Sequence, residues 1–428
     1  MTGDRAVVIV DGVRTPFCKA WGTLQDVPVD DLARLALAES MARVELDPKE
    51  VGEVVVGNIA QPAETTTLAR IAALRAGVPR QVPAVTVNRN CGSGMEAIVT
   101  AWHRIQAGAA DVVLAGGAES MSRIPFQMTQ GFTKRVMTLR KARSLPARVR
   151  ALLGFTRADI TPYPALEVGL RDAWSGLNMA ETAEVLARRF DIGRDEQDAY
   201  AVESHRRAIA GRARLREEIV PFFPPPAQEP VADDVGPRED QSLEQLQRLK
   251  PLFDRRWGTV TAGNSCMLTD GAAALVIMSE ERARTLGMPY LGRIRSWAFA
   301  GLDPEVMGLG PVHAAHLALK RAALSMHDMQ LLEINEAFAA QVLAVLKAFA
   351  SASFGRDSLG RDGALGAVSP EIVNVNGGAI ALGHPVGCSG VRLVLTLLKE
   401  MARRDLTYGL AALCIGGGQG AAIVVERS

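Results

Sequence analysis

The chain has 428 residues, of which 48% are hydrophobic and 22% charged, so it is globular and long enough for two or three domains. Its 48 Lys and Arg residues balance 47 Asp and Glu residues to a net charge of +1, whereas a nucleic-acid binder usually carries a large basic excess, so no nucleic-acid partner is expected. No stretch approaches the ~20 apolar residues that a membrane span needs.

Strand-like and helical segments alternate along the first part of the chain. Short runs rich in Val and other apolar residues over 6–10, 53–57 and 111–116 have the composition of buried strands. Helical patterns lie between them, over 31–41, 67–76 and 95–107. This alternation predicts an α/β fold in which helices cover buried sheets.

The composition changes between residues 122 and 250, where Arg, Pro and short helical patterns prevail, and we interpret this part as an inserted lid. Within it, the segment 134–157 carries eight Lys and Arg residues and no Asp or Glu. Ser144 and Gly154 delimit a short predicted helix inside the segment. It is interpreted as a solvated basic surface helix, or as a site for an acidic partner, an anionic lipid surface or the phosphates of a ligand.

The last third of the chain repeats a pattern of the first. Val-Asn-Arg-Asn at 87–90 precedes a predicted helix, a strand and the glycine pair at 116–117. Val-Asn-Val-Asn at 373–376 precedes a predicted helix, a strand and the three glycines at 416–418. We predict a duplicated α/β unit with the active site between its halves.

Cys91 lies where a β-branched run changes into small residues and then into a helix, in Asn-Arg-Asn-Cys-Gly-Ser-Gly-Met at 88–95. This pattern predicts a thiol at the first turn of a helix, where unpaired backbone N–H groups and the helix dipole favour the thiolate. The alternative is a small buried core residue. The neighbouring glycines favour the nucleophile, because they let backbone N–H groups approach a substrate carbonyl.

His384 and Cys414 lie in two further glycine-rich turns, Gly-His-Pro-Val-Gly at 383–387 and Cys-Ile-Gly-Gly-Gly at 414–418. His384 is a candidate base for the Cys91 proton. Cys414 is a candidate second acid or base, since a thiol with a pKa of ~8–9 suits carbon acids and other thiols. A hydrogen-bonded structural histidine and a buried thiol are the alternatives. The three turns predict one cysteine-based site, and no metal is expected in it.

Together these motifs closely resemble the thiolase family. The resemblance runs from Val-Arg-Thr-Pro-Phe at 13–17 through Asn-Glu-Ala-Phe-Ala at 335–339 to the turns of His384 and Cys414. Each motif alone is weak, but their order and spacing are specific. The resemblance implies a duplicated αβαβα five-layer sandwich with an inserted lid domain. Its expected parts are an N-terminal half over 1–121, completed by about 251–280, a lid over CoA at 122–250 and a C-terminal half over 281–428.

The resemblance also implies an acyltransferase that cleaves 3-ketoacyl-CoA with CoA to acetyl-CoA and a shortened acyl-CoA. Cys91 would attack the 3-keto carbon and carry the acyl group, with His384 receiving its proton. Cys414 would protonate the departing enolate and then activate CoA. One oxyanion hole would pair His384 with a water held by Asn335, and the other would use the backbone N–H groups of Cys91 and Gly416. The implied substrate contacts are Met179, Cys266 and Phe338.

Two positions depart from the family pattern. Cys266 stands where many thiolases have a serine near the CoA pantetheine, and Asn178 stands where short-chain biosynthetic thiolases have a histidine. Asn178 and the basic insertion favour fatty-acid β-oxidation. The alternatives are a biosynthetic acetoacetyl-CoA thiolase, a condensing enzyme of the ketoacyl-synthase or hydroxymethylglutaryl-CoA-synthase kind, and a catalytically silent thiolase-like protein that binds CoA or lipid.

The expected partners are acyl-CoA and CoA, with CoA as a substrate and no permanently bound cofactor. We expect a homodimer or homotetramer, and a hydratase/dehydrogenase partner subunit or an anionic membrane surface at segment 134–157. The five scattered cysteines and the absence of a signal-like segment at the N-terminus predict a cytoplasmic location.

Overall fold

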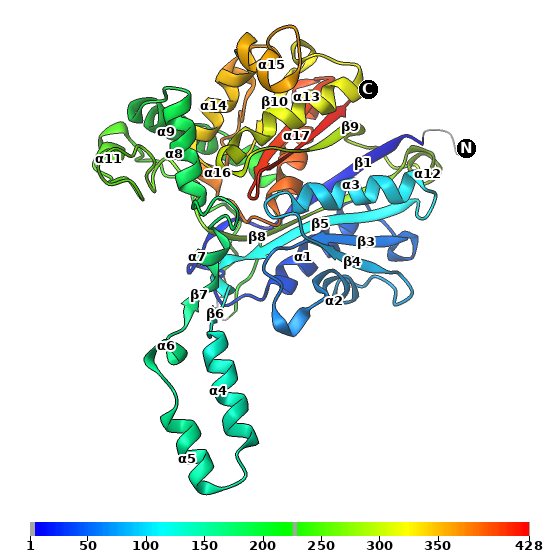
Figure 1. Ribbon diagram of the computed structural model, residues 1–428. Helices are drawn as coiled ribbons and strands as arrows, with labels where there is room; N and C mark the ends of the chain where they lie inside the picture. Colours follow the sequence, from blue (N-terminus) through cyan, green and yellow to red (C-terminus); the bar gives the residue numbers. More distant parts are fainter. Residues whose placement is uncertain (1–4, 226–228, 428) are drawn as a thin grey trace.

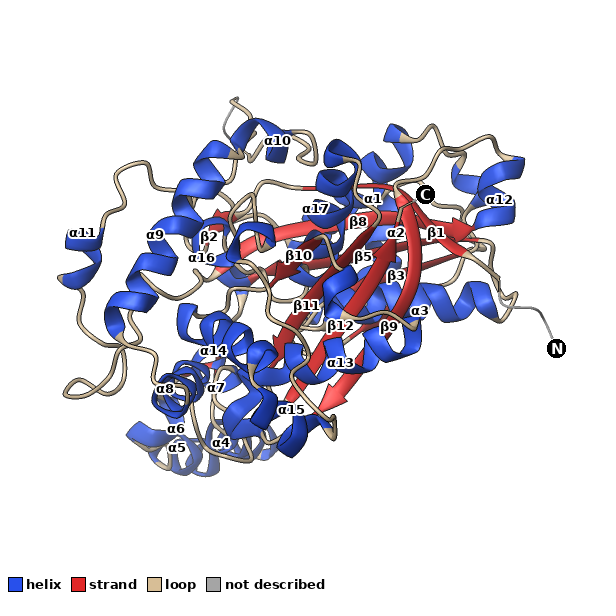
Figure 2. Cartoon of the chain, turned by 90° about the horizontal axis from the view of Figure 1, so that it is seen from above, coloured by secondary structure: helices blue, strands red, loops and turns tan. Residues whose placement is uncertain are grey.

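The computed structural model describes residues 5–225 and 229–427, in which a mixed ten-stranded sheet forms the centre of the molecule (Figures 1 and 2). The strands run in the order β10-β11-β12-β9-β1-β8-β5-β3-β4, and β2 pairs with β8. Only two residue pairs, Val8 with Arg293 and Ile9 with Gly292, join β1 to β9. The strands are β1 (Val7–Arg14), β2 (Cys18–Lys19), β3 (Glu53–Gly57), β4 (Ala84–Val87), β5 (Val112–Ser120), β8 (Thr269–Ser279), β9 (Gly292–Gly301), β10 (Leu331–Ile334), β11 (Tyr408–Ile415) and β12 (Gln419–Glu426).

The two parts of the sheet on either side of this junction have the same topology. In the first, β3 is parallel to β4 and β5, and β8 is antiparallel to β5 and β1. In the second, β10 is parallel to β11, and β12 is antiparallel to β11 and β9. Val373 forms a single parallel bridge with Leu332 of β10, at the place that β4 takes beside β3. The predicted duplication is therefore confirmed, and the two Val-Asn motifs occupy equivalent positions.

Alternating side chains of each half-sheet enter two different cores, as expected for strands buried on both faces. In β3, Val55 faces the central core, whereas Val54 and Val56 face an outer core with α1 (Val29–Arg43) and α2 (Leu68–Arg75). The central core also contains α3 (Ser93–Gln106), α17 (Ser389–Arg404) and residues of both half-sheets.

The opposite face of the second half-sheet packs on α13 (Gly310–Ala322) and α14 (Ala339–Ala350). The layers are therefore α1 and α2, the first half-sheet, α3 and α17, the second half-sheet, and α13 with α14. This order confirms the predicted five-layer αβαβα sandwich.

The long connection between β5 and β8 has two parts. Helices α4 (Gln130–Lys141), α5 (Leu145–Leu153) and α6 (Arg157–Ile160) form an arm that extends away from the rest of the molecule in Figure 1. Helices α8 and α9 instead contact α14 in the second half. The remaining elements are β6 (Phe126–Gln127), β7 (Tyr163–Pro164), α7 (Ala165–Gly169), α8 (Met179–Arg189), α9 (Arg194–Ala210), α10 (Arg212–Arg216), α11 (Leu243–Gln247), α12 (Glu280–Thr285), α15 (Ala352–Leu359) and α16 (Ala379–Leu382).

The predicted helices are present with small shifts in their ends, and the short helix expected after Ser144 is α5. Ser144 accepts a hydrogen bond from the Ala147 amide (3.4 Å), and Gly154 ends the helix. None of the helices in the described parts of the chain combines the length and apolar character that a membrane crossing requires.

Candidate active site

Cys91 lies in a tight turn between β4 and α3. The turn requires a positive φ of 44° at Asn90, and it is closed by a hydrogen bond from the Gly92 amide to the Arg89 carbonyl (2.9 Å). A side chain at Gly92 would collide with Ile415 at the end of β11. The glycine after Cys91 therefore lets the first turn of α3 approach the strand that carries Cys414.

The backbone N–H groups of Gly416 and of Cys91 itself lower the pKa of the Cys91 thiol. The Asn90 side chain donates to the Gly416 carbonyl (2.9 Å), which fixes the two turns against each other. Burial nevertheless raises the pKa of the Cys91 thiol to about 11, and the two N–H groups lower it only in part. The N–H groups at the helix start act in the expected direction, but desolvation is the larger effect, so the resting site favours the thiol over the thiolate.

The His384 imidazole is buried in the turn between α16 and α17. Its Nδ1 lies 2.6 Å from Ser389 Oγ, and that hydroxyl donates to the Pro385 carbonyl (3.2 Å). Nδ1 therefore carries the proton and donates to Ser389, which leaves Nε2 as a free base. Burial, followed by the charge of Arg392, lowers the pKa of His384 to about 3, so the imidazole is neutral.

Asn335 follows β10 and is held by a hydrogen bond from its amide to the Ala412 carbonyl (2.9 Å). Its side-chain Nδ2 lies 3.4 Å from His384 Nε2. Its Oδ1 is buried and has no hydrogen-bond partner within the described residues. The side chain therefore places one donor at the base and leaves one acceptor free.

Cys414 is buried in β11, directly before the glycine turn at 416–418. Burial raises the pKa of its thiol, and the charges of Cys91 and Cys266 raise it further, which places the three sulfurs in one neighbourhood. Cys266 is held by a hydrogen bond from its amide to the Ala337 carbonyl (3.0 Å). Burial raises the pKa of Cys266 to about 12.

Met179 and Phe338 border the same region. Met179 begins α8, and a Cβ at Gly416 would lie 3.3 Å from its sulfur. Phe338 precedes α14 and forms a bridge with Ser265, one residue before Cys266. Asn178 caps α8 by accepting a hydrogen bond from the Ala180 amide (3.0 Å), so its side chain has a structural function.

The structure thus links the predicted residues through two groups of contacts. One joins Cys91, Gly416 and Met179, and the other joins His384 and Asn335, with Cys414 and Cys266 close to Cys91. No described cluster of three His, Cys, Asp or Glu side chains is arranged to hold a metal ion. Three further buried polar residues of this region were not predicted from the sequence, namely Glu119, Ser389 and Arg392. Glu119 follows a predicted strand and the glycine pair at 116–117, a signal that could have identified it.

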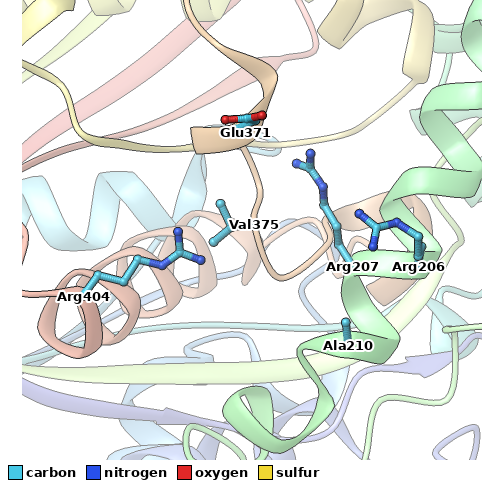
Figure 3. A pocket seen from close by; sticks show the side chains of 6 residues that line it. All are labelled: Arg206, Arg207, Ala210, Glu371, Val375 and Arg404. Atoms are coloured by element: carbon cyan, nitrogen blue, oxygen red, sulfur yellow. The ribbon is translucent and has the colours of Figure 1, made fainter.

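A surface pocket of about 250 Å³ lies apart from these residues (Figure 3). It is lined by Arg206, Arg207, Ala210, Glu371, Val375 and Arg404. Its arginines form ion pairs with Glu203 and Glu400 at 2.6 Å, so each already has a carboxylate partner. None of the predicted site residues lines it.

Comparisons with known proteins agree with the fold and the motifs. Residues 7–281 match the model of the thiolase N-terminal domain, and residues 288–427 match that of the thiolase C-terminal domain. The 3-ketoacyl-CoA thiolase of Pectobacterium atrosepticum is 40% identical, with 99% of this chain and 97% of the relative covered. That of Yersinia pestis is 39% identical with the same coverage.

Solved structures give the same result. The Bacillus anthracis acetyl-CoA acetyltransferase has a TM-score of 0.87 and 38% identity, with all of both chains covered. Human mitochondrial 3-ketoacyl-CoA thiolase in complex with CoA has a TM-score of 0.85 and 37% identity, with 99% of this chain and 98% of that chain covered. The chain therefore belongs to the thiolase family of acyltransferases.

Proposed function

We propose that the protein is a 3-ketoacyl-CoA thiolase that uses CoA to release acetyl-CoA and a shortened acyl-CoA. The observation that carries the proposal is the Cys91 turn, which Asn90 ties to Gly416 (2.9 Å) and which packs through Gly92 against Ile415, the residue that follows Cys414. The relatives that match the whole chain are named 3-ketoacyl-CoA thiolases, which supports the same reaction.

In the first half-reaction, the Cys91 sulfur attacks the 3-keto carbon and its proton passes to Nε2 of His384. The unprotonated Nε2 fits this step, because Nδ1–H is engaged with Ser389 and only the long contact with Asn335 Nδ2 (3.4 Å) occupies Nε2. The bond between C2 and C3 then breaks, which leaves the acyl group on Cys91. The acetyl-CoA enolate takes the proton of the Cys414 thiol.

In the second half-reaction, the Cys414 thiolate removes the proton of an incoming CoA thiol. The CoA sulfur attacks the acyl thioester, and the Cys91 sulfur leaves and recovers its proton from His384. Cys414 suits both transfers because burial raises its pKa, which keeps a proton on sulfur for the enolate and makes the resulting thiolate a strong base for the CoA thiol.

Two sets of donors would stabilise the oxyanions of these steps. The N–H groups of Cys91 and Gly416 would form one set, and their lowering effect on the pKa of Cys91 supports it. His384 and a water held by Asn335 form the other, and the free buried Oδ1 of Asn335 supports this role, since such an acceptor is costly without a partner. Loss of one such donor typically lowers turnover ~10²–10³-fold. Met179, Cys266 and Phe338 would border the substrate, with CoA as a substrate and no resident cofactor.

The direction of the reaction in the cell is proposed to be degradative, in fatty-acid β-oxidation. Asn178 supports this direction, because its side chain caps α8 and leaves no imidazole at the place that short-chain biosynthetic thiolases fill with histidine. Acetoacetyl-CoA synthesis is the alternative, and the likeness to an acetyl-CoA acetyltransferase favours it. We further propose a homodimer or homotetramer in the cytoplasm, where a reducing environment keeps Cys91 and Cys414 as thiols.

The arm of α4, α5 and α6 is proposed to contact an anionic membrane surface. It carries the eight basic residues of segment 134–157, and α5 leaves four apolar side chains exposed, which are Leu145, Val149, Leu152 and Leu153. A basic helix with an exposed apolar side is typical of proteins that bind anionic lipid. A hydratase/dehydrogenase subunit is the second candidate partner.

We further propose that the chain divides at 121/122 and at 250/251, with residues 122–250 covering CoA.

The test of the function is CoA-dependent cleavage of 3-ketoacyl-CoA substrates of increasing chain length, followed by loss of enolate absorbance. We expect cleavage by the reduced protein and, for Cys91→Ser, loss of both turnover and the S-acyl intermediate detectable by mass spectrometry. No cleavage at any chain length would reject the function. An unchanged rate in Cys91→Ser would remove Cys91 from its role.

A further inference from the structure

Glu119 is a buried carboxylate near the end of β5, and the proposed reaction gives it no role. It accepts hydrogen bonds from the amides of Ile59 (3.0 Å), Ala60 (3.1 Å) and Gly387 (3.2 Å) and from the Asn58 side chain (3.0 Å). No cation within the described residues forms an ion pair with it. A fully buried carboxylate without a cation is rare, and four donors from two sequence-distant loops compensate it here.

One of these loops supports the Cys91 turn. The Asn58 amide donates to the Val87 carbonyl (3.1 Å), and the Asn88 side chain donates to the Ile59 carbonyl (3.4 Å). Val87 and Asn88 lead directly into the turn that carries Cys91. The position of the carboxylate therefore influences the position of the nucleophile through two short connections.

The other loop carries the base. Gly387 follows His384 by three residues, and its amide is bound to Glu119. A Cβ at Gly387 would lie 2.7 Å from Glu119 Oε2, and one at Gly117 would collide with the Gly387 carbonyl. The Glu119 carboxylate therefore packs directly against the backbone of Gly387. A change in the length or charge of this side chain would shift the His384 turn.

We propose that Glu119 is a positioning residue of the thiolase reaction, which holds the Cys91 turn and the His384 turn at the spacing that proton transfer requires. This inference rests on the proposed function. Burial raises the pKa of Glu119 to about 7 in spite of its hydrogen bonds. In its ionised form its charge adds a small upward shift to the pKa of Cys91, beside the larger effect of burial. A single carboxylate thus sets both the spacing of the two turns and part of the electrostatics of the thiol.

The test compares Glu119→Gln with a matched control, Glu184→Gln. Glu184 is also buried and accepts two backbone amides, of Thr259 and Val260 (both 2.7 Å), but it contacts neither catalytic turn. We expect Glu119→Gln to lower kcat about 100-fold, the loss that a misplacement of 1 Å can cause. KM for CoA should change little, since the hydrogen bonds of Glu119 go to residues 58–60 and 387 and not to residues 122–250, which are proposed to cover CoA. Glu184→Gln should lose stability without losing kcat.

Glu119→Asp provides the second variant, because it keeps the charge and shortens the side chain. If Glu119→Gln does not fold, a folded Glu119→Asp with a reduced kcat and an unchanged KM supports the proposal. The proposal is overturned if the variant that folds has a kcat within about twofold of the wild type and equal to that of Glu184→Gln. Absence of cleavage by the wild-type protein would instead reject the proposed function, so the two failures are distinguishable.

Discussion

At Cys91, burial and hydrogen bonding act on the thiol in opposite directions, and burial prevails. An ion pair of thiolate and imidazolium requires the imidazole to hold the proton more strongly than the thiol does. Here the pKa of Cys91 is about 11 and that of His384 about 3, so the proton stays on sulfur in the resting site. His384 then acts as a base only when the substrate is bound and the new bond to carbon makes the thiol acidic.

This neutral pair predicts a specific alkylation profile. Without substrate, modification of Cys91 by iodoacetamide should rise about tenfold per pH unit through pH 7–10, because only the thiolate reacts and its fraction grows in that proportion below the pKa. Mass spectrometry of the Cys91 peptide gives the rate, and Cys91→Ala corrects for labelling of the other cysteines. A rate that is high and constant from pH 6 to 9 would instead demonstrate a preformed ion pair.

At this scale the residues that the sequence reveals are those in glycine-rich turns. Cys91, His384 and Cys414 are recognisable because the backbone around each must approach another strand or helix, which leaves glycines in the sequence. Arg392 lies in an ordinary helix pattern, and its partner Glu333 is distant in the chain. Glu119 follows a glycine pair, but Gly387, whose amide it binds, is distant as well. The direction of the Cys91 pKa was not predictable for the same reason, since its burial comes from strands far away in sequence.

At the scale of elements, the arm is the least covered part of the structure. Leu145 and Leu153 of α5 are 74% and 82% exposed, although both are large apolar side chains. Ser144 and Gly154 allowed this helix to be predicted, but the sequence does not reveal that no other layer covers it. Exposed apolar side chains beside basic ones favour the anionic membrane over a purely solvated helix.

The arm predicts charge-dependent binding to vesicles. The wild-type protein should sediment with vesicles that contain anionic lipid and not with neutral ones. Arg148→Glu with Arg150→Glu should weaken binding at least about 30-fold, since each basic residue near such a surface contributes ~1 kcal/mol. Reversal of Arg34 and Arg284, which lie on the body of the protein, is the control and should have little effect. Unchanged sedimentation in the arm variant would exclude the lipid surface and leave the partner subunit.

At the scale of the whole molecule, the site depends on how the two halves meet. The helix starts of α3 and α17 touch through glycines: a Cβ at Gly94 would lie 2.9 Å from the Val391 amide, and one at Gly390 would lie 2.5 Å from the Met95 amide. Both halves therefore bring catalytic turns to the junction, that of Cys91 from the first and those of His384 and Cys414 from the second. The repeated Val-Asn and glycine motifs were enough to predict this duplication, but not the side chains that join the insertion to it.

Arg14 joins the insertion to both halves from a fully buried position in β1. Its guanidinium pairs with Glu218 (2.6 Å) and bidentately with Asp234 (2.6 and 2.7 Å), and both carboxylates belong to the connection between β5 and β8. Thr396 of α17 donates to Glu218 (3.0 Å), which ties the central layer to the same group. The negative charges of Glu218 and Asp234 are therefore both compensated by the single cation Arg14.

Removal of that cation should destabilise the whole fold. Arg14→Met keeps the apolar volume but leaves two buried carboxylates without their cation, a change that costs about 3–5 kcal/mol in the free energy of unfolding. Urea denaturation followed by circular dichroism measures this loss. Arg206→Met, which removes an exposed arginine paired with Glu203, is the control and should leave the midpoint nearly unchanged. Equal midpoints for Arg14→Met and the wild type would mean that the insertion is held by its apolar contacts alone.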